Sequence, residues 1–182
     1  MLLALVGITG IGKSFFVDKI TKNLDFKKVH TLRTRPLRKG ESPEYFLTDE
    51  ALNQMYEEGK IAYKFSVFGG QYGYLQEEIF SKENMIFEMH YTTIYDWKKV
   101  RPDIKTIYIL PTDINMAKQK TKERNLSPEK EQERLAEIDE HYQRIMTDED
   151  LRKQFDYIVY NNYDKKSEEM MLELVNRLLR EG

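Results

Sequence analysis

A glycine-rich segment directly after an apolar run is the feature that most restricts what this chain can fold into. Residues 7–14 read GITGIGKS and fit the phosphate-loop pattern G-x-x-x-x-G-K-[ST], and the apolar run before them covers residues 2–6. After the loop, apolar side chains recur at helical spacing, at Phe16, Ile20 and Leu24. The sequence therefore predicts a buried strand, a tight loop and a helix in direct succession.

The chemistry of this pattern explains its composition. Glycines let the backbone turn tightly and direct its N–H groups inward, so the loop forms a nest for phosphate oxygens at the N-terminus of the helix. In such loops the lysine, here Lys13, reaches the β- and γ-phosphates, and the hydroxyl residue, here Ser14, holds Mg²⁺. We therefore expect the chain to bind a nucleoside triphosphate. The alternative is a glycine-rich turn that happens to end in Lys-Ser.

Four short apolar runs indicate the fold class. They cover residues 2–6, 85–89, 106–110 and 157–160, and helix-like stretches separate them. This alternation is the pattern of a parallel sheet with helices on both faces. We expect an α/β fold, the three-layer P-loop NTPase architecture with a central parallel sheet. A closing helix is expected over residues 165–180, with one apolar stripe of Met171, Leu174, Val175 and Leu178.

The 182 residues fit a single domain, and two segments interrupt the alternation. Between about 33 and 82, a capped helix start at Thr48 and aromatic, glycine-containing segments predict an inserted lobe of strands and helix, expected to bind the acceptor. Between about 124 and 146, a charged helix that restarts at Ser127-Pro128 predicts a mobile lid. The core then comprises residues 1–32, 83–123 and 147–182.

Charge and cysteine content exclude several classes of protein. A net charge of −2 lacks the basic excess that nucleic-acid and membrane-surface binders require, so we expect neither partner. The first apolar run is too short to span a membrane and lacks a basic flank. Without cysteine there is no disulfide or thiolate site, and the simplest location is cytoplasmic. The spacing of the three histidines predicts no metal site of the H-E-x-x-H kind.

Several motifs, in order along the chain, resemble those of the guanylate kinase family of nucleoside monophosphate kinases. Residues 34–41 (TRPLRKGE) resemble the family element T-R-x-P-R-x-G-E, and residues 46–52 (FLTDEAL) resemble F-V-S-x-x-E-F. Residues 69–73 (GGQYG) resemble G-x-x-Y-G, and residues 155–162 (FDYIVYNN) are similar to F-D-Y-V-I-V-N-D. Because the pieces keep their order and spacing from the phosphate loop nearly to the C-terminus, the resemblance covers most of the chain.

The resemblance implies roles for residues on the acceptor side. Arg35 and Arg38 fall where the family clamps the acceptor monophosphate, and Tyr72 falls where a tyrosine contacts the same phosphate. Paired guanidinium forks suit a phosphate that must be held still for in-line attack. Glu88 aligns with the first acidic residue of the family's D-x-D strand end, which places it near Mg²⁺ or its waters.

On the donor side, the resemblance implies ATP and Mg²⁺ as cofactors. Arg124 and Arg134 match the two lid arginines that reach over the transferring phosphoryl group. The catalytic set is then Lys13, Arg35, Arg38, Arg124 and Arg134, with Ser14 at the metal. The nucleotide-binding set is Gly7, Gly10, Ile11, Gly12, Lys13, Ser14 and Phe15.

The chain departs from the family where the base of the acceptor is read. Tyr63, Tyr74 and His90 stand where the family has a glutamate, a serine and the second acid of D-x-D. Guanine presents N–H donors, so the loss of both acids removes their charge-assisted partners. A shortened loop also leaves Glu44 where the family has a phosphate-binding tyrosine, and Tyr45 replaces it if the register shifts by one residue.

The sequence thus predicts a Mg²⁺- and ATP-dependent kinase that acts on a phosphorylated small molecule, with GMP as the first acceptor by resemblance. One alternative is a related kinase for another nucleotide or for a ribose bisphosphate, which the changed base-reading positions suit. Another is a non-catalytic module that binds a phosphopeptide through Arg35, Arg38 and Tyr72, and a third is a nucleotide-binding regulator without turnover. We expect a monomer or a homodimer.

Overall fold

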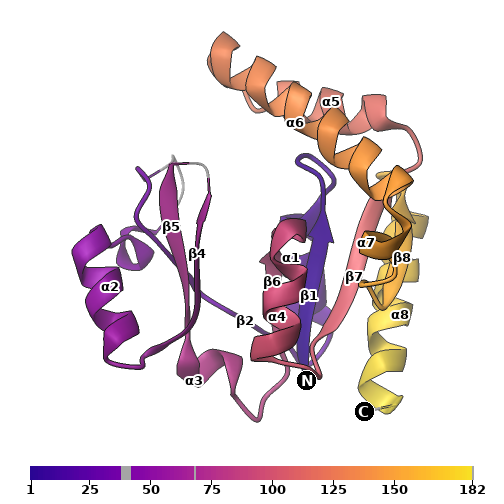
Figure 1. Cartoon of the computed structure of the whole chain (residues 1–182). Coiled ribbons are helices and arrows are strands. Elements are labelled where there is room, and N and C mark those ends of the chain that lie inside the picture. The colour runs from indigo at the N-terminus through magenta and orange to yellow at the C-terminus, as the bar shows by residue number, and fades with distance from the viewer. Residues whose placement is uncertain (38–41, 68, 182) are drawn as a thin grey trace.

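Two β-sheets of different kinds organise the chain. The computed structural model describes residues 1–37, 42–67 and 69–181. A five-stranded sheet forms the core and a three-stranded sheet forms a lobe beside it (Figure 1). The core strands are β1 (Leu2–Gly7), β2 (Lys27–Lys28), β6 (Met85–Met89), β7 (Lys105–Pro111) and β8 (Tyr157–Asn161). The lobe strands are β3 (Thr31–Arg33), β4 (Ile61–Val67) and β5 (Gly70–Leu75).

The core sheet is parallel throughout, in the order β2-β6-β1-β7-β8. The four predicted apolar runs form β1, β6, β7 and β8, so the predicted α/β class and central parallel sheet are confirmed. The strand β2 is two exposed residues long and lies at the sheet edge. No apolar run marks it, which is why the sequence did not predict it.

Helices cover both faces of this sheet. The helices are α1 (Lys13–Asn23), α2 (Asp49–Glu57), α3 (Gln76–Ile79), α4 (Ile94–Val100), α5 (Ile114–Lys122), α6 (Pro128–Thr147), α7 (Glu149–Arg152) and α8 (Lys165–Glu181), with short 3₁₀ turns η1 (Pro43–Tyr45) and η2 (Tyr91–Thr93). Leu3 and Leu5 of β1 pack in one buried cluster with α1 and α8, whereas Leu2 and Val6 pack in another with α4. Strict alternation along a fully buried strand thus builds two hydrophobic cores.

The lobe has a small core of its own. Its strands pair antiparallel, and α2 packs on them through Leu52, which meets Leu32 and Ile61. The predicted helix start is confirmed, because the Thr48 side chain accepts a hydrogen bond from the Ala51 N–H at 3.2 Å.

The predicted charged helices become α5 and α6. The helix α6 begins with Pro128 in its first turn, as expected from Ser127-Pro128. Lys118 of α5 forms an ion pair with Asp139 of α6 at 2.7 Å. The side chains of Ile138 and Ile145 are fully buried in the two core clusters, so the C-terminal part of α6 is anchored while its N-terminal part extends above the lobe (Figure 1). Within the described residues, no helix has the length and apolar character needed to cross a membrane.

An aromatic seam joins the lobe to the core. Trp97 of α4 is fully buried, and its ring lies 4.9 Å from the rings of Tyr63 and Tyr74 in the lobe and 4.8 Å from Phe87 in β6. Edge and tilted contacts of this kind stabilise beyond the burial of area alone.

We expect Trp97→Ala to lower the free energy of unfolding by about 3–5 kcal/mol, because it removes the largest side chain of the seam and leaves a cavity. Urea unfolding followed by circular dichroism measures this. Tyr95→Ala is the control, since Tyr95 lies on the same helix but is 49% exposed, and we expect it to be nearly neutral. Equal losses for the two variants would contradict the packing described here.

Candidate active site

The phosphate loop connects β1 to α1, as predicted, and its glycines adopt conformations that other residues rarely reach. Gly10 has φ 80° and Gly12 has φ 92°. A Cβ added to Gly10 would lie 2.5 Å from the backbone oxygen of Ala117, so both its backbone angle and the lack of space require glycine there. The loop is therefore held against α5 as well as against the sheet.

Two residues far along the chain hold the loop in place. The buried Asn161 side chain donates from Nδ2 to the Ile11 carbonyl at 2.9 Å. The Tyr163 hydroxyl donates to the Gly10 carbonyl at 3.1 Å, and the Tyr163 N–H donates to Asn161 Oδ1 at 2.8 Å. Sequence reasoning placed Asn161 in a motif of the family but gave neither residue a role at the loop.

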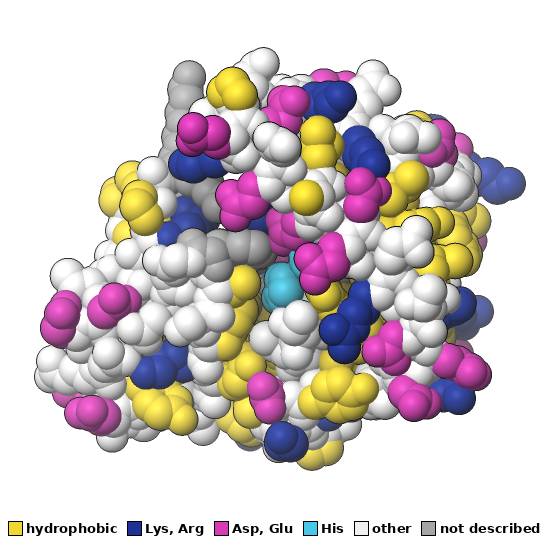
Figure 2. Space-filling model, turned by 45° about the horizontal axis from the view of Figure 1, so that its top comes forward, with side chains coloured by type: hydrophobic (Ala, Val, Ile, Leu, Met, Phe, Trp, Pro, Cys, Tyr) yellow, Lys and Arg dark blue, Asp and Glu magenta, His cyan; other side chains and the backbone are white. Residues whose placement is uncertain are grey.

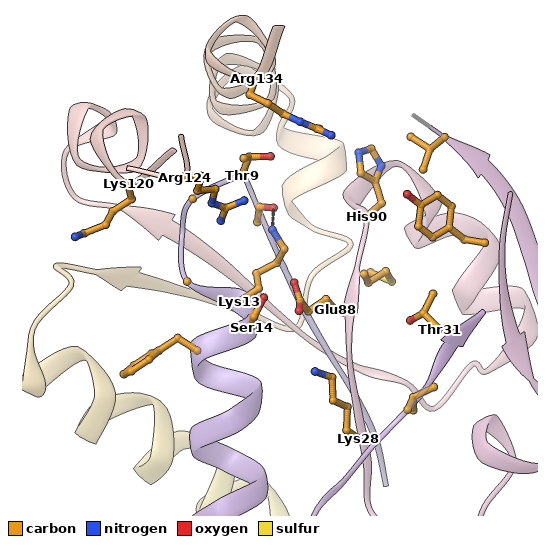
Figure 3. Close-up of a pocket in the computed structure, with 18 of the residues that line it drawn as sticks. Thr9, Lys13, Ser14, Lys28, Thr31, Glu88, His90, Lys120, Arg124 and Arg134 are labelled. Carbon is orange, nitrogen blue, oxygen red and sulfur yellow. Dashed lines mark hydrogen bonds between the residues drawn. The ribbon is translucent and has the colours of Figure 1, made fainter. Parts of the chain in front are cut away.

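Lys13 folds back onto the loop. Its Nζ donates to the carbonyls of Gly7 at 2.7 Å and Ile8 at 3.0 Å. Burial lowers the pKa of the Lys13 ammonium, and nearby Glu88 opposes that shift. Figure 3 shows Lys13, Ser14 and Glu88 directed into the same space, with Arg124 beside the loop.

A cavity of about 1340 Å³ runs from the phosphate loop to the lobe and under α6. Eight lysine or arginine residues and four acidic residues line it among the described part of the chain, so it is positive within a chain whose net charge is −2. A positive cleft of this size suits ligands that carry several phosphates. Lys28 and Arg33, which received no individual role from the sequence, also line it.

On the lobe side, the structure brings Arg35 and Tyr72 together, although 37 positions separate them. Arg35 is 7% exposed; its Nε donates to the Tyr72 hydroxyl at 3.1 Å, and its guanidinium lies 5.3 Å from the Phe46 ring. Arg38 lies outside the described residues. Tyr45 lines the cavity and stacks on His30 at 4.5 Å.

The three base-reading positions differ in placement. Tyr74 is 3% exposed within the aromatic seam, and burial raises the pKa of its hydroxyl. The Tyr63 hydroxyl donates to Asp96 Oδ2 at 3.2 Å, and Tyr63 is not among the described residues that line the cavity. His90 lines the cavity, and burial lowers its pKa to about 4, so the ring is neutral at pH 7.

The helix α6, which the sequence predicted to be part of a lid, places Arg134 and Glu137 on the cavity. Arg134 donates from a terminal guanidinium nitrogen to Glu137 Oε2 at 2.6 Å, and both side chains are largely buried. Figure 3 shows Arg134 extending from its helix toward His90, across the top of the pocket. Both lid arginines line the cavity. Their roles and those of the other assigned site residues stay predictions.

Comparisons with known proteins agree with the motifs. No family model matches the chain. It is 27% identical over 183 residues to a guanylate kinase of Bdellovibrio bacteriovorus, covering 94% of each chain. It is 26% identical over 162 residues to a guanylate kinase of Pseudomonas fluorescens (strain Pf0-1), covering 85% of this chain and 76% of the relative. These similarities confirm the resemblance to the guanylate kinase family.

Solved structures support the fold. A guanylate kinase from Anaplasma phagocytophilum matches all of this chain and 85% of its own with a TM-score of 0.71 at 18% identity. A shikimate kinase from Bacteroides thetaiotaomicron matches with a TM-score of 0.52 at 13% identity, covering 99% of this chain and 98% of its own. The three-layer P-loop fold is thereby confirmed.

We expect Gly10→Ala to destabilise the protein by more than the roughly 1–2 kcal/mol that a left-handed residue costs, because its Cβ also meets the Ala117 carbonyl. The matched control is Gly59→Ala, where φ is 73° but no atom lies within 4 Å of the added Cβ. Urea unfolding of both variants separates backbone strain from steric overlap. A Gly59→Ala loss as large as that of Gly10→Ala would contradict this interpretation.

We expect Asn161→Ala to cost about 1–3 kcal/mol, because it leaves a buried carbonyl of the loop without its partner. It should also weaken ATP binding, measured by isothermal titration calorimetry, since the loop loses a hydrogen bond that fixes its conformation. Asn162→Ala is the control, because this neighbouring side chain is exposed and accepts a hydrogen bond from the Thr112 hydroxyl, away from the loop. If Asn162→Ala weakened ATP binding equally, the Asn161 contact would not hold the loop.

Proposed function

We propose that this protein, which resembles guanylate kinases along most of its length, is an ATP-dependent nucleoside monophosphate kinase that converts ATP and GMP to ADP and GDP. The observation that carries the proposal is the continuous cation-lined cavity between an intact phosphate loop and the lobe that holds Arg35 and Tyr72. A triphosphate on the loop and a monophosphate on the lobe would meet inside it.

Positioning and charge neutralisation would supply the catalysis. An oxygen of the acceptor phosphate attacks the γ-phosphorus of ATP, the bond from the γ-phosphorus to the β,γ-bridging oxygen breaks, and ADP leaves. The attacking oxygen is already anionic near neutral pH, so no general base is needed. Lys13, Arg35, Arg124 and Arg134 line the cavity and would offset the charge of the transferring group, and Arg38 would join them.

The residues at the loop suit Mg²⁺. Ser14 offers a hydroxyl at the start of α1, and Glu88 offers a carboxylate close to Lys13, which are the oxygen ligands this ion prefers. Ser14 and Glu88 would hold the ion or its waters, and the ion would supply positive charge that offsets the repulsion between donor and acceptor phosphates. Closure of α6 over the cavity would exclude water that could otherwise accept the phosphoryl group.

A second candidate keeps the reaction and changes the acceptor. Tyr74 is buried in the seam, the Tyr63 hydroxyl is engaged by Asp96, and the His90 ring is neutral. None of the three therefore offers the carboxylate that the N–H donors of guanine favour. This observation favours another nucleotide or a ribose bisphosphate as the alternative acceptor.

We expect a coupled assay with Mg-ATP to detect ADP release when an acceptor is added. The acceptor is GMP or one member of a panel of dGMP, AMP, CMP, UMP, dTMP, IMP and ribose bisphosphate. Lys13→Ala should reduce kcat by about 10²–10³-fold, since it removes a charge that stabilises the transition state. Lys22→Ala is the matched control, because Lys22 is exposed at the other end of the same helix.

The outcome decides between the hypotheses. Turnover of GMP supports the proposal as stated, and turnover of another member alone identifies the second candidate. ATP binding without turnover of any acceptor contradicts both kinases and favours the phosphopeptide-binding module or the regulator.

A further inference from the structure

Three side chains from two distant parts of the chain converge on the roof of the cavity. His90 follows the end of β6, whereas Glu137 and His141 lie one turn apart on α6. One nitrogen of each ring and one carboxylate oxygen all lie within 4.8 Å of one another. We propose that these residues form a binding site for a transition-metal ion that ties the lid helix to the core.

The donor set has the chemistry of such a site. Two imidazoles and one carboxylate form the three-ligand set that zinc sites use when a fourth position is open to water or another ligand. Imidazole favours zinc and its neighbours in the transition series over Mg²⁺, which takes oxygen ligands. This site is therefore expected to select a different ion from the one that Ser14 would hold.

Neighbouring groups orient the donors. The Nδ1 atom of His90 lies 2.7 Å from Thr92 Oγ1, so the tautomer that donates this bond carries its ring lone pair on Nε2. Glu137 Oε2 accepts from Arg134 at 2.6 Å, whereas Oε1 lies 3.9 Å from His141 Nδ1. Metal ligands typically have such hydrogen-bonded partners, which fix their orientation.

The donors are also largely shielded from solvent. The side chains of Glu137 and His141 are only 13% and 12% exposed, and the His141 ring packs on Tyr91 at 4.6 Å. Figure 2 shows a histidine at the base of a hollow with acidic side chains above it.

The geometry requires a small movement. A tetrahedral site with metal–ligand distances of about 2.1 Å separates its donors by roughly 3.4 Å, so donors within 4.8 Å of one another must converge by at most roughly 1.4 Å. Rotation of side chains or a slight descent of α6 would supply it. Because Arg134 lies three residues before Glu137, the bound ion would hold this arginine over the cavity and resist opening of the lid.

The direct test is a titration of the untagged chain, freed of metal by dialysis against a chelator, with Zn²⁺ in a calorimeter. The same titration with Co²⁺ gives an absorption spectrum that reports the ligand geometry. We expect one ion per chain, and at least about a tenfold loss of affinity in His90→Ala, Glu137→Gln and His141→Ala.

The control for this test is His30→Ala. It removes the remaining histidine, which lies between β2 and β3 and pairs with Glu78, so this variant should bind Zn²⁺ as tightly as the wild type. Equal affinity in all variants, or an equal loss in His30→Ala, would overturn the site. His141→Gln replaces His141→Ala if circular dichroism shows that the latter does not fold. This test measures Zn²⁺ binding and not turnover, so its failure would not count against the proposed kinase activity.

Limited trypsin cleavage tests the tie to the lid. We expect Zn²⁺ to slow cleavage after the exposed Arg124 in the wild type and in His30→Ala, and to have no effect in His90→Ala. Binding of Zn²⁺ without slower cleavage in the wild type would overturn the tie between lid and core.

Discussion

The parallel register of three central strands is the constraint on which the site depends. Val6 of β1 lies opposite Met89 of β6 on one side and Tyr108 of β7 on the other. Parallel strands in register end at the same edge of a sheet, so the segments that follow them begin side by side. The phosphate loop, His90 and the chain that leads into α5 are those segments. Hydrogen bonding between backbones thus assembles a site from parts that are far apart in sequence.

Most of the fold could be predicted because its signals are local. A fully buried strand needs an unbroken apolar run, so β1, β6, β7 and β8 were visible without knowledge of their neighbours. The phosphate loop was equally visible, because the glycines and Lys13 that build it are contiguous. By contrast, β2 is formed by Lys27–Lys28, and only pairing with the buried strand β6 makes these exposed residues a strand.

The parts of the site that escaped prediction depend on contacts across the fold. Asn161 supports the loop from 150 positions away, and neither residue type nor spacing marks it. The pair Glu137 and His141 is visible as a helical spacing, but His90 joins it only because β6 ends beneath α6. The resemblance assigned Arg35 and Tyr72 to the same phosphate but predicted no contact between them, and the pairing of Arg33 with Tyr72 between β3 and β5 explains that contact.

The aromatic seam also limits how this architecture can be rearranged. The lobe has a small buried cluster of its own in Leu32, Leu52 and Ile61. The face of its sheet that carries Tyr74 is covered instead by Trp97 and Phe87 of the core. Excised alone, it would expose Tyr74 to water. A graft of this lobe onto a related scaffold therefore has to bring α4 with it, so the unit of recombination is larger than the lobe.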